Sequence, residues 1–139
     1  MSRTIAPRLD HVRVSAAMRP GIVSCPPETP LRAVAQLMAS HHIHAVVVPE
    51  VTGDGVAGWA IASDLDVVAA AVAGDAEALT AGDVAGHEAL TVSDDEQLDR
   101  AMQRMAEHES GHLVVVGAAS GRPTGILSTL DVAAVLSIS

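Results

Sequence analysis

Aromatic residues are almost missing from this sequence: its 139 residues include one tryptophan and no phenylalanine or tyrosine. Proteins that bind single-stranded nucleic acids stack bases on aromatic side chains, so this mode of recognition has almost nothing to use here. Lysine is absent, and eight arginines face seventeen acidic residues, which gives a net charge of −9. Such a charge repels nucleic-acid phosphates and anionic lipids. The composition therefore predicts neither a nucleic-acid partner nor a membrane partner.

Cysteine is also scarce, because Cys25 is the single one and cannot form an internal disulfide. The first ten residues show no charged-then-apolar leader, and no apolar run approaches the length of a membrane-spanning helix. A chain of this length with 49% hydrophobic residues can bury a core without disulfides or metals. We therefore expect a cytoplasmic protein that requires no cofactor to fold.

The chain contains an internal repeat, which is seen when the sequence is shifted against itself by 67 residues. Two copies of this length predict two small subdomains related by a pseudo-two-fold axis, with a cleft between them. We assign an N-terminal arm to residues 1–11, the first repeat to 12–74 and the second to 75–139. Without a gap, the shift aligns identical residues in these pairs: Leu31 with Leu98, Gln36 with Gln103, Met38 with Met105, Ala39 with Ala106, His41 with His108, Gly58 with Gly125 and Asp64 with Asp131.

Each copy predicts the order strand, helix, strand, strand, helix, which places the fold in the α+β class. Thr29 is expected to cap the first helix of repeat one, with Pro30 in its first turn. Ser93 and Glu96 have the spacing of a capping box in repeat two. The predicted elements are residues 22–25, 31–38, 45–48, 56–61 and 63–73 in the first copy, and 89–92, 98–108, 112–116, 125–128 and 132–136 in the second.

The predicted helix over residues 65–73 is apolar on every side. Packing one face of such a helix against its own sheet leaves a second apolar face to be covered. We expect a second chain, in a homodimer, or the other repeat to cover it.

The element order, with a Gly-x-x-Ser/Thr-x-x-Asp run into the last helix, resembles a tandem CBS-domain pair, or Bateman module, over about residues 12–138. The run is complete in repeat two, from Gly125 through Ser128 to Asp131. At the constant shift, repeat one has Ile61 at the hydroxyl position and Asp64 at the acidic one. The resemblance implies a regulatory module that binds an adenosine-containing ligand in the cleft between the repeats.

In such a site Asp131 would accept hydrogen bonds from ribose hydroxyls, and Ser128 with Thr129 at the helix N-terminus would meet a phosphate. The alternative is that these residues only cap the helix. Because the alkyl group of Ile61 cannot donate a hydrogen bond, we predict one good site on repeat two and a weaker second site at Asp64.

In one relative within this family, a His-Arg pair just before the apolar strand of one repeat reaches phosphates held by the opposite repeat. Here His44 is followed by Ala45, and His112 is preceded by Gly111, so each repeat keeps half of the pair. We assign His44 and Arg19 to the main site and His112 to the weaker one. This favours a monophosphate or an uncharged adenosyl group over ATP, and leaves AMP, ATP, NAD, S-adenosylmethionine and a cyclic dinucleotide open.

Two other functions are compatible with the sequence. A ligand-free structural dimerisation module is one, and a metal-binding module is the other. An enzyme is not predicted, since no catalytic arrangement is visible and Cys25 is expected to pack in a strand. A regulated partner protein is expected, but the sequence does not identify it. The metal alternative depends on histidines near two equivalent helix ends: His41, His42, His44, His108 and His112.

Overall fold

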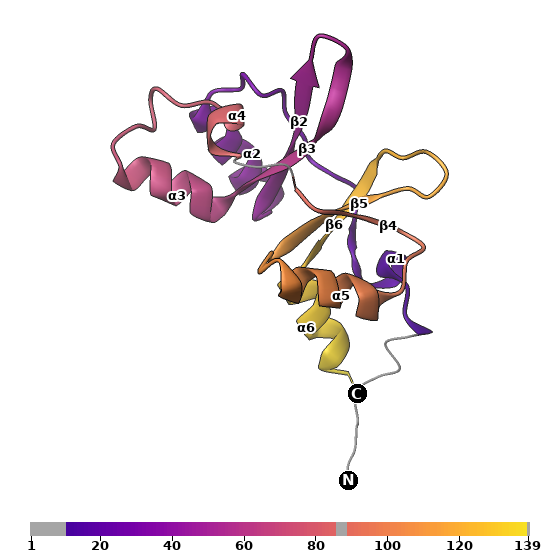
Figure 1. Ribbon diagram of the computed structural model, residues 1–139. Coiled ribbons are helices and arrows are strands. Elements are labelled where there is room, and N and C mark those ends of the chain that lie inside the picture. The colour runs from indigo at the N-terminus through magenta and orange to yellow at the C-terminus, as the bar shows by residue number, and fades with distance from the viewer. Residues whose placement is uncertain (1–10, 86–88, 139) are drawn as a thin grey trace. The chain divides into compact units, whose positions relative to one another are not determined.

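The structure, a computed structural model, describes residues 11–85 and 89–138 and divides the chain into two compact units. Unit 1 contains Met1–Ile22 and Leu90–Ser139, and unit 2 contains Val23–Ala89. Figure 1 shows the indigo segment around α1 beside the orange and yellow elements from the C-terminal part of the chain. The compact units are thus divided differently from the sequence repeats, because the segment before residue 23 folds with the second repeat.

Unit 1 is built on a four-stranded sheet with the order β1-β6-β5-β4. β6 pairs antiparallel with β1 and with β5, whereas β4 runs parallel to β5. Side chains of α5 and α6 pack against one face of this sheet. The elements of unit 1 are α1 (Val14–Ala17), β1 (Arg19–Pro20), β4 (Thr91–Ser93), α5 (Leu98–Glu107), β5 (His112–Val116), β6 (Pro123–Ser128) and α6 (Thr129–Leu136).

The N-terminal segment joins unit 1 through its backbone and one buried side chain. The N–H of Val14 donates to the carbonyl of Glu96 (2.9 Å), and the Val14 side chain is fully buried in the unit 1 core. β1 then approaches β6 so closely that a Cβ on Gly125 would lie 2.5 Å from the carbonyl oxygen of Arg19. Glycine is therefore required at position 125 by the close approach of β1.

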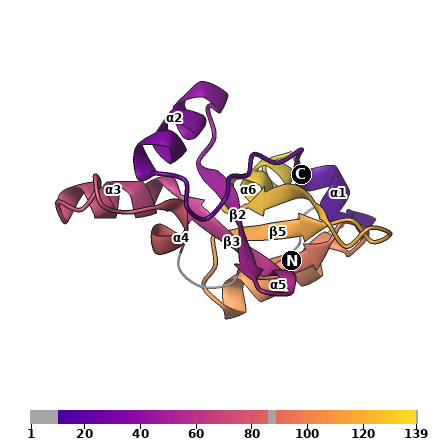
Figure 2. The ribbon, with the colours of Figure 1, turned by 90° about the horizontal axis from the view of Figure 1, so that it is seen from above.

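Unit 2 is built on the antiparallel hairpin of β2 and β3. The segment that was predicted as a strand over 22–25 contributes a single parallel bridge, from Ser24 to Val47. Figures 1 and 2 both show the hairpin tip projecting beyond α2 and α3, and the residues at this tip are exposed. The elements of unit 2 are α2 (Leu31–His41), β2 (Ala45–Thr52), β3 (Gly55–Ser63), α3 (Asp64–Val72) and α4 (Ala81–Val84).

Each unit has its own hydrophobic core, which is made of aliphatic side chains. α2 and α5 bury residues spaced three or four apart, which is the pattern of an amphipathic helix. None of the helices in the described ranges is long and apolar enough to cross a membrane. The buried sets are Leu31, Val34 and Met38 in α2, and Leu98, Ala101 and Met105 in α5. These sets occupy equivalent positions, so the predicted repeat of the α+β unit is confirmed.

The predicted cap of α2 is wrong. Pro30 is the N-cap residue, and Thr29 makes no capping bond. The N–H of Leu31 instead donates to the carbonyl of Leu79 (3.1 Å). A distant backbone carbonyl thus satisfies a helix-terminal N–H group that a side chain was expected to satisfy.

The predicted capping box at α5 is wrong for the same reason. Gln97 is the N-cap residue, and no side chain caps this helix. The N–H of Leu98 donates to the carbonyl of Val12 (2.8 Å), which belongs to the N-terminal segment. Ser93 and Glu96 are therefore not needed as caps.

Candidate ligand site

α6 begins with a reciprocal cap made by Ser128 and Asp131. The N–H of Asp131 donates to Ser128 Oγ (3.2 Å), while Asp131 Oδ2 accepts from the N–H (2.8 Å) and the hydroxyl (3.0 Å) of Ser128. Asp131 Oδ1 accepts no hydrogen bond from the part of the chain that the structure describes. One carboxylate oxygen holds the helix start, and the other can accept a hydrogen bond from a ligand. Capping and ligand binding are therefore compatible roles for Asp131.

α3 of unit 2 begins with the same cap, formed by Ser63 and Asp66. Asp66 Oδ2 accepts from the N–H (2.8 Å) and the hydroxyl (2.9 Å) of Ser63. In the strand register Ala45 pairs with Ser63, whereas its equivalent His112 pairs with Ser128. The hairpin of unit 2 is therefore two residues longer than that of unit 1.

This insertion corrects the alignment of the two repeats at the site. Asp66, and not Asp64, is the counterpart of Asp131, and the hydroxyl position of repeat one is occupied by Ser63. Ile61 stands two residues before that position. The prediction that repeat one has lost the hydroxyl is therefore wrong, and so is the use of Asp64 as the equivalent acidic residue. A gapless shift of the sequence misaligns the two repeats after the hairpin, because the two extra residues of unit 2 lie within the hairpin.

The sequence did contain a signal for the missed residues. Ala60, Ser63 and Asp66 have the same spacing as the complete signature of repeat two, with alanine in place of glycine. The identity of Gly58 with Gly125 at the constant shift hid this second alignment. Strand pairing decides between the two, because Ala60 and Ser63 occupy the register positions that correspond to those of repeat two.

Two side chains able to donate to an anion lie beside Ser128 on the sheet of unit 1. His112 on β5 is directly opposite Ser128 on β6, and Arg19 on β1 is directly opposite Ile126. Paired residues of antiparallel strands project from the same face, and Ile126 precedes Ser128 by two positions. Arg19, His112 and Ser128 thus share one face, opposite to the face on which Leu127 enters the helix-covered core.

Arg19 is exposed, and its side chain forms no hydrogen bond or ion pair with residues 11–85 or 89–138. Three of the other described arginines have side chains that are already engaged. Arg13 and Arg104 donate to backbone carbonyls, and Arg32 forms an ion pair with Glu77 (2.6 Å). The guanidinium of Arg19 is therefore available to an anionic ligand.

The residues beneath the first turn of α6 and α3 differ between the units. The N–H of Thr129 donates to the carbonyl of Gly111 (3.1 Å), and the N–H of Asp64 donates to the carbonyl of His44 (2.9 Å). These two pairs of residues are therefore equivalent. In unit 2 the side chains of this pair also meet, with His44 Nδ1 2.7 Å from Asp64 Oδ2. The structure therefore brings the two predicted residues of unit 2 to each other.

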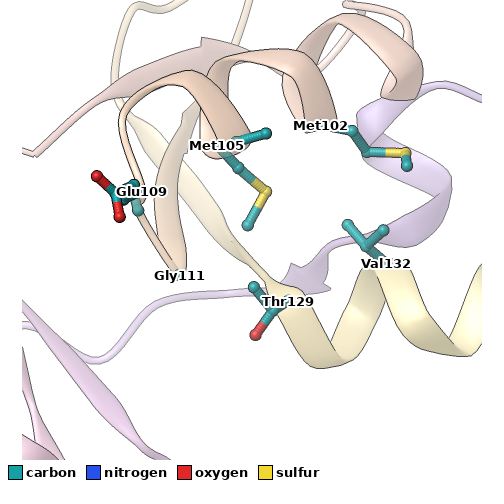
Figure 3. Close-up of a pocket in the computed structure, with 8 residues that line it drawn as sticks. Met102, Met105, Glu109, Gly111, Thr129 and Val132 are labelled. Carbon is teal, nitrogen blue, oxygen red and sulfur yellow. The ribbon is translucent and has the colours of Figure 1, made fainter.

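A pocket of about 430 Å³ lies at the equivalent place in unit 1, between the end of α5, the turn into β5 and the start of α6. Figure 3 shows Met105 above Thr129, with the methyl group of Thr129 directed toward the methionine. The pocket lies on the helix side of the sheet, whereas Ser128 projects from the opposite face. The side chain of Thr129 therefore lines this pocket, while its neighbours Ser128 and Asp131 form the cap. The full lining is Met102, Met105, Ala106, Glu109, Ser110, Gly111, Thr129 and Val132.

The histidines of the metal alternative lie in both units. His108 Nδ1 contacts the carbonyl of Arg104 (2.9 Å), and His44 is held by Asp64. Across residues 11–85 and 89–138, no three His, Cys, Asp or Glu side chains gather closely enough to hold a metal ion. The described part of the chain therefore offers no metal centre from these histidines.

Cys25 is buried in the unit 2 core, at a position equivalent to the buried Val92. Burial raises the pKa of its thiol, and this outweighs the opposite effect of a hydrogen bond with Thr29. A raised pKa keeps the sulfur in the unreactive thiol form. Cys25 is therefore a packing residue in this structure.

The CBS domain family model matches the chain over residues 14–67 and 81–138. The chain belongs to the CBS-domain family. No curated protein sequence matches it. The predicted resemblance is confirmed, and each matched segment contains one of the two Ser-x-x-Asp caps described above.

Solved structures of other proteins, CBS domain proteins among them, share this fold. Hypoxic Response Protein I, solved with two coordinated zinc ions, is 25% identical over 88% of this chain and 98% of its own, with a TM-score of 0.67. A CBS domain protein from Pyrobaculum aerophilum complexed with AMP is 23% identical, covering 92% and 100% of the two chains, with a TM-score of 0.72. A CBS domain pair in complex with 5′-methylthioadenosine and S-adenosyl-L-methionine is 18% identical, covering 91% and 96%, with a TM-score of 0.73.

Proposed function

We propose that this chain is a regulatory module that binds an adenosine-containing ligand, with its main anchors in unit 1. The observation that carries the proposal is the second carboxylate oxygen of Asp131, which is available beside a face bearing Ser128, His112 and Arg19. The AMP and S-adenosylmethionine complexes of proteins with the same fold support this class of ligand. The module regulates a partner protein through its occupancy and does not itself catalyse a reaction.

Each polar group of unit 1 has a chemical role in this proposal. Asp131 Oδ1 accepts hydrogen bonds from the vicinal hydroxyls of the ribose, as carboxylates do in dinucleotide-binding folds. Arg19 donates to the phosphate in a charge-assisted hydrogen bond, and His112, which the sequence assigned to the weaker site, takes the place of His44 because it lies opposite Ser128. One guanidinium and one imidazole suit a single phosphate better than three. AMP, or an adenosyl compound without phosphate, is therefore favoured over ATP.

A weaker second site is proposed in unit 2, anchored by Asp66. Its carboxylate has the same free oxygen beside the same cap, judged from the described residues. The residue opposite Ser63 is Ala45, however, which offers no donor to a phosphate. Unit 2 is thus better suited to a ribose than to a phosphorylated sugar.

We also propose that the module acts as a homodimer through its apolar helices. Six large aliphatic side chains on or just after α3 and α6 are exposed, three on α3 in unit 2 and three on or after α6 in unit 1. A standard interface buries about 800 Å² per partner, of which roughly 60% is apolar. Such an interface requires exposed apolar side chains, and each of the two units supplies three of them. These side chains are Leu65, Val68, Val72, Leu130, Leu136 and Ile138.

Calorimetric titration of a panel of adenosine compounds tests the ligand proposal. The wild-type chain is expected to bind at least one member of the panel, and Asp131→Asn to weaken that binding by at least about tenfold, since a hydrogen bond to a charged group is lost. Arg19→Gln should weaken binding of AMP but not of an uncharged adenosyl compound.

Asp66→Asn is the matched control, because it alters the same cap in the other unit. It should leave the main site within about threefold of wild type, a change of about 0.65 kcal/mol, which is smaller than the ~1 kcal/mol of one neutral hydrogen bond. Equal losses in Asp131→Asn and Asp66→Asn would show that cap stability, and not ligand contact, is being measured. Absence of binding by every compound in the panel would overturn the proposal.

A further inference from the structure

The pocket between α5 and α6 of unit 1 has larger residues at the corresponding place in unit 2. Ser110 and Gly111 stand at the positions of Ile43 and His44, and a Cβ on Gly111 would meet nothing within 4 Å. In unit 2, Ile43 packs against the core, and His44 reaches across to the start of α3. The shared fold therefore does not require the hollow. Its volume of about 430 Å³ lies in the range of small-molecule sites.

The lining of this pocket is mostly apolar, and Glu109 is its one charged residue. Figure 3 shows Glu109 on one side of the pocket and Met102 with Val132 on the other, with Met105 between them. The Glu109 side chain is exposed and forms no hydrogen bond or ion pair within the described part of the chain. Its carboxylate points away from Met105, so a bound group meets it at the mouth of the pocket. This arrangement complements a molecule with an apolar body and a positive end.

The backbone at Glu109 has a conformation that favours a different residue. α5 ends in a Schellman motif, in which the N–H of Ser110 donates to the carbonyl of Met105 (2.9 Å). Glu109 occupies the left-handed position of this motif, with φ 50°, where glycine is usual. A negative charge at a helix C-terminus is also opposed by the helix dipole. The fold by itself therefore does not account for a carboxylate at this position.

We infer that the pocket is a second ligand site, for an organic ammonium ion with an apolar body. The body lies between Met105 and Thr129, where the flexible thioether adapts to an aromatic or aliphatic group. The ammonium group stays at the mouth and pairs with Glu109 and with the negative end of the α5 dipole. This site is separate from the proposed adenosine site, because Ser128 projects from the opposite face of the sheet.

An NMR titration of the full chain, without nucleotide, tests the inference with three compounds of similar shape. Phenethylammonium is the cation, phenethyl alcohol the neutral compound and phenylacetate the anion. The methyl signals of Met102 and Met105 are expected to shift, while that of Met38, the unit 2 counterpart of Met105, stays unchanged. At low salt the cation should bind at least about threefold more tightly than the alcohol, and about 1 M salt should reduce this advantage. Phenylacetate should bind most weakly.

Variants at the charged end test the role of the carboxylate. Glu109→Gln removes the charge and keeps the shape, so it should cancel the advantage of the cation over the alcohol. Glu107→Gln is the matched control, because it removes one charge from the end of the same helix outside the pocket, and it should change binding by less than about twofold. Glu109→Gly should lose the same selectivity without lowering the unfolding temperature, since glycine adopts a positive φ freely. A lower unfolding temperature would indicate a structural role instead.

Filling the pocket tests its location. Ser110→Ile combined with Gly111→His installs the two residues of unit 2, and this variant should bind none of the three compounds while circular dichroism verifies that it is folded. Equal binding of the cation and the alcohol by the wild-type chain would overturn the inference. So would the absence of binding, which is the result expected if a second copy closes the pocket in the proposed homodimer. Since no nucleotide is present, neither result bears on the proposed adenosine site.

Discussion

Unit 1 and unit 2 start a helix with the same serine–aspartate cap but surround it with different groups. Opposite the cap serine, unit 1 has His112 and unit 2 has Ala45. Beneath the first helical turn, unit 1 has Gly111 beside an open pocket, and unit 2 has the His44–Asp64 pair. The cap belongs to the shared fold, and the groups around it differ. A ligand preference is therefore to be sought in those surrounding groups.

The charges show the same difference between the units. Only Arg32 of the described arginines lies in unit 2, where it is paired with Glu77. Unit 1 therefore carries most of the positive charge that an anionic ligand requires. Its described arginines are Arg13, Arg19, Arg100, Arg104 and Arg122.

The largest effect is expected from the equivalent core leucines, Leu98 and Leu31, which are almost fully buried. Leu98→Ala and Leu31→Ala should each lower the free energy of unfolding by about 2–5 kcal/mol, because each leaves a cavity. Urea unfolding of the two variants measures this. If the units are packed equally well, the two losses agree within about 1 kcal/mol. This difference is smaller than the range of free-energy losses that Leu→Ala substitutions produce in different cores. A loss in one variant alone would show that one unit lacks a well-packed core.

A smaller effect is expected at Gly125, whose counterpart in unit 2 is Ala60. Gly125→Ala should cost about 1–3 kcal/mol, since the added Cβ collides with the carbonyl of Arg19 and displaces β1. It should also weaken AMP binding if Arg19 contacts the phosphate. Ala60→Gly, the reverse change, should cost no more than about 1 kcal/mol. Thermal unfolding of the two variants with and without AMP measures these effects. An unfolding temperature of Gly125→Ala equal to that of the wild type would contradict the close approach of β1.

The smallest effect is expected from the His44–Asp64 pair, because its side chains are 71% and 54% exposed. Asp64→Asn should change the free energy of unfolding by less than about 1 kcal/mol, since solvent screens exposed ion pairs. Asp66→Asn, two residues away, should cost more because its carboxylate caps α3. Urea unfolding of the two variants measures both losses in the free energy of unfolding. A larger loss in Asp64→Asn would mean that the pair, and not the cap, secures the start of α3.

Local patterns in the sequence were sufficient for most of the elements and for the family. The strand predicted over 112–116 has the bounds seen in the structure. The spacing of buried residues in α2 and α5 was visible because side chains of one helix face recur every three or four residues. The Ser128–Asp131 signature was readable because a helix cap involves residues only three positions apart.

Contacts between distant segments could not be read in this way. The carbonyls of Leu79 and Val12 replace the side-chain caps predicted for α2 and α5. Hydrogen bonds between residues that are far apart in the sequence join the N-terminal segment to the second repeat. Such pairings depend on which chain segments meet in space, and no local pattern encodes them.

The sequence by itself thus determined the repeated α+β units, their aliphatic cores and the Ser128–Asp131 pair, because periodicity, composition and short spacings act locally. The tertiary structure alone decided that Asp66 replaces Asp64 as the second acidic residue, because strand register depends on the length of a hairpin. It also decided that Arg19 and His112 share a face with Ser128, since three strands must pair before residues so far apart in the chain become neighbours.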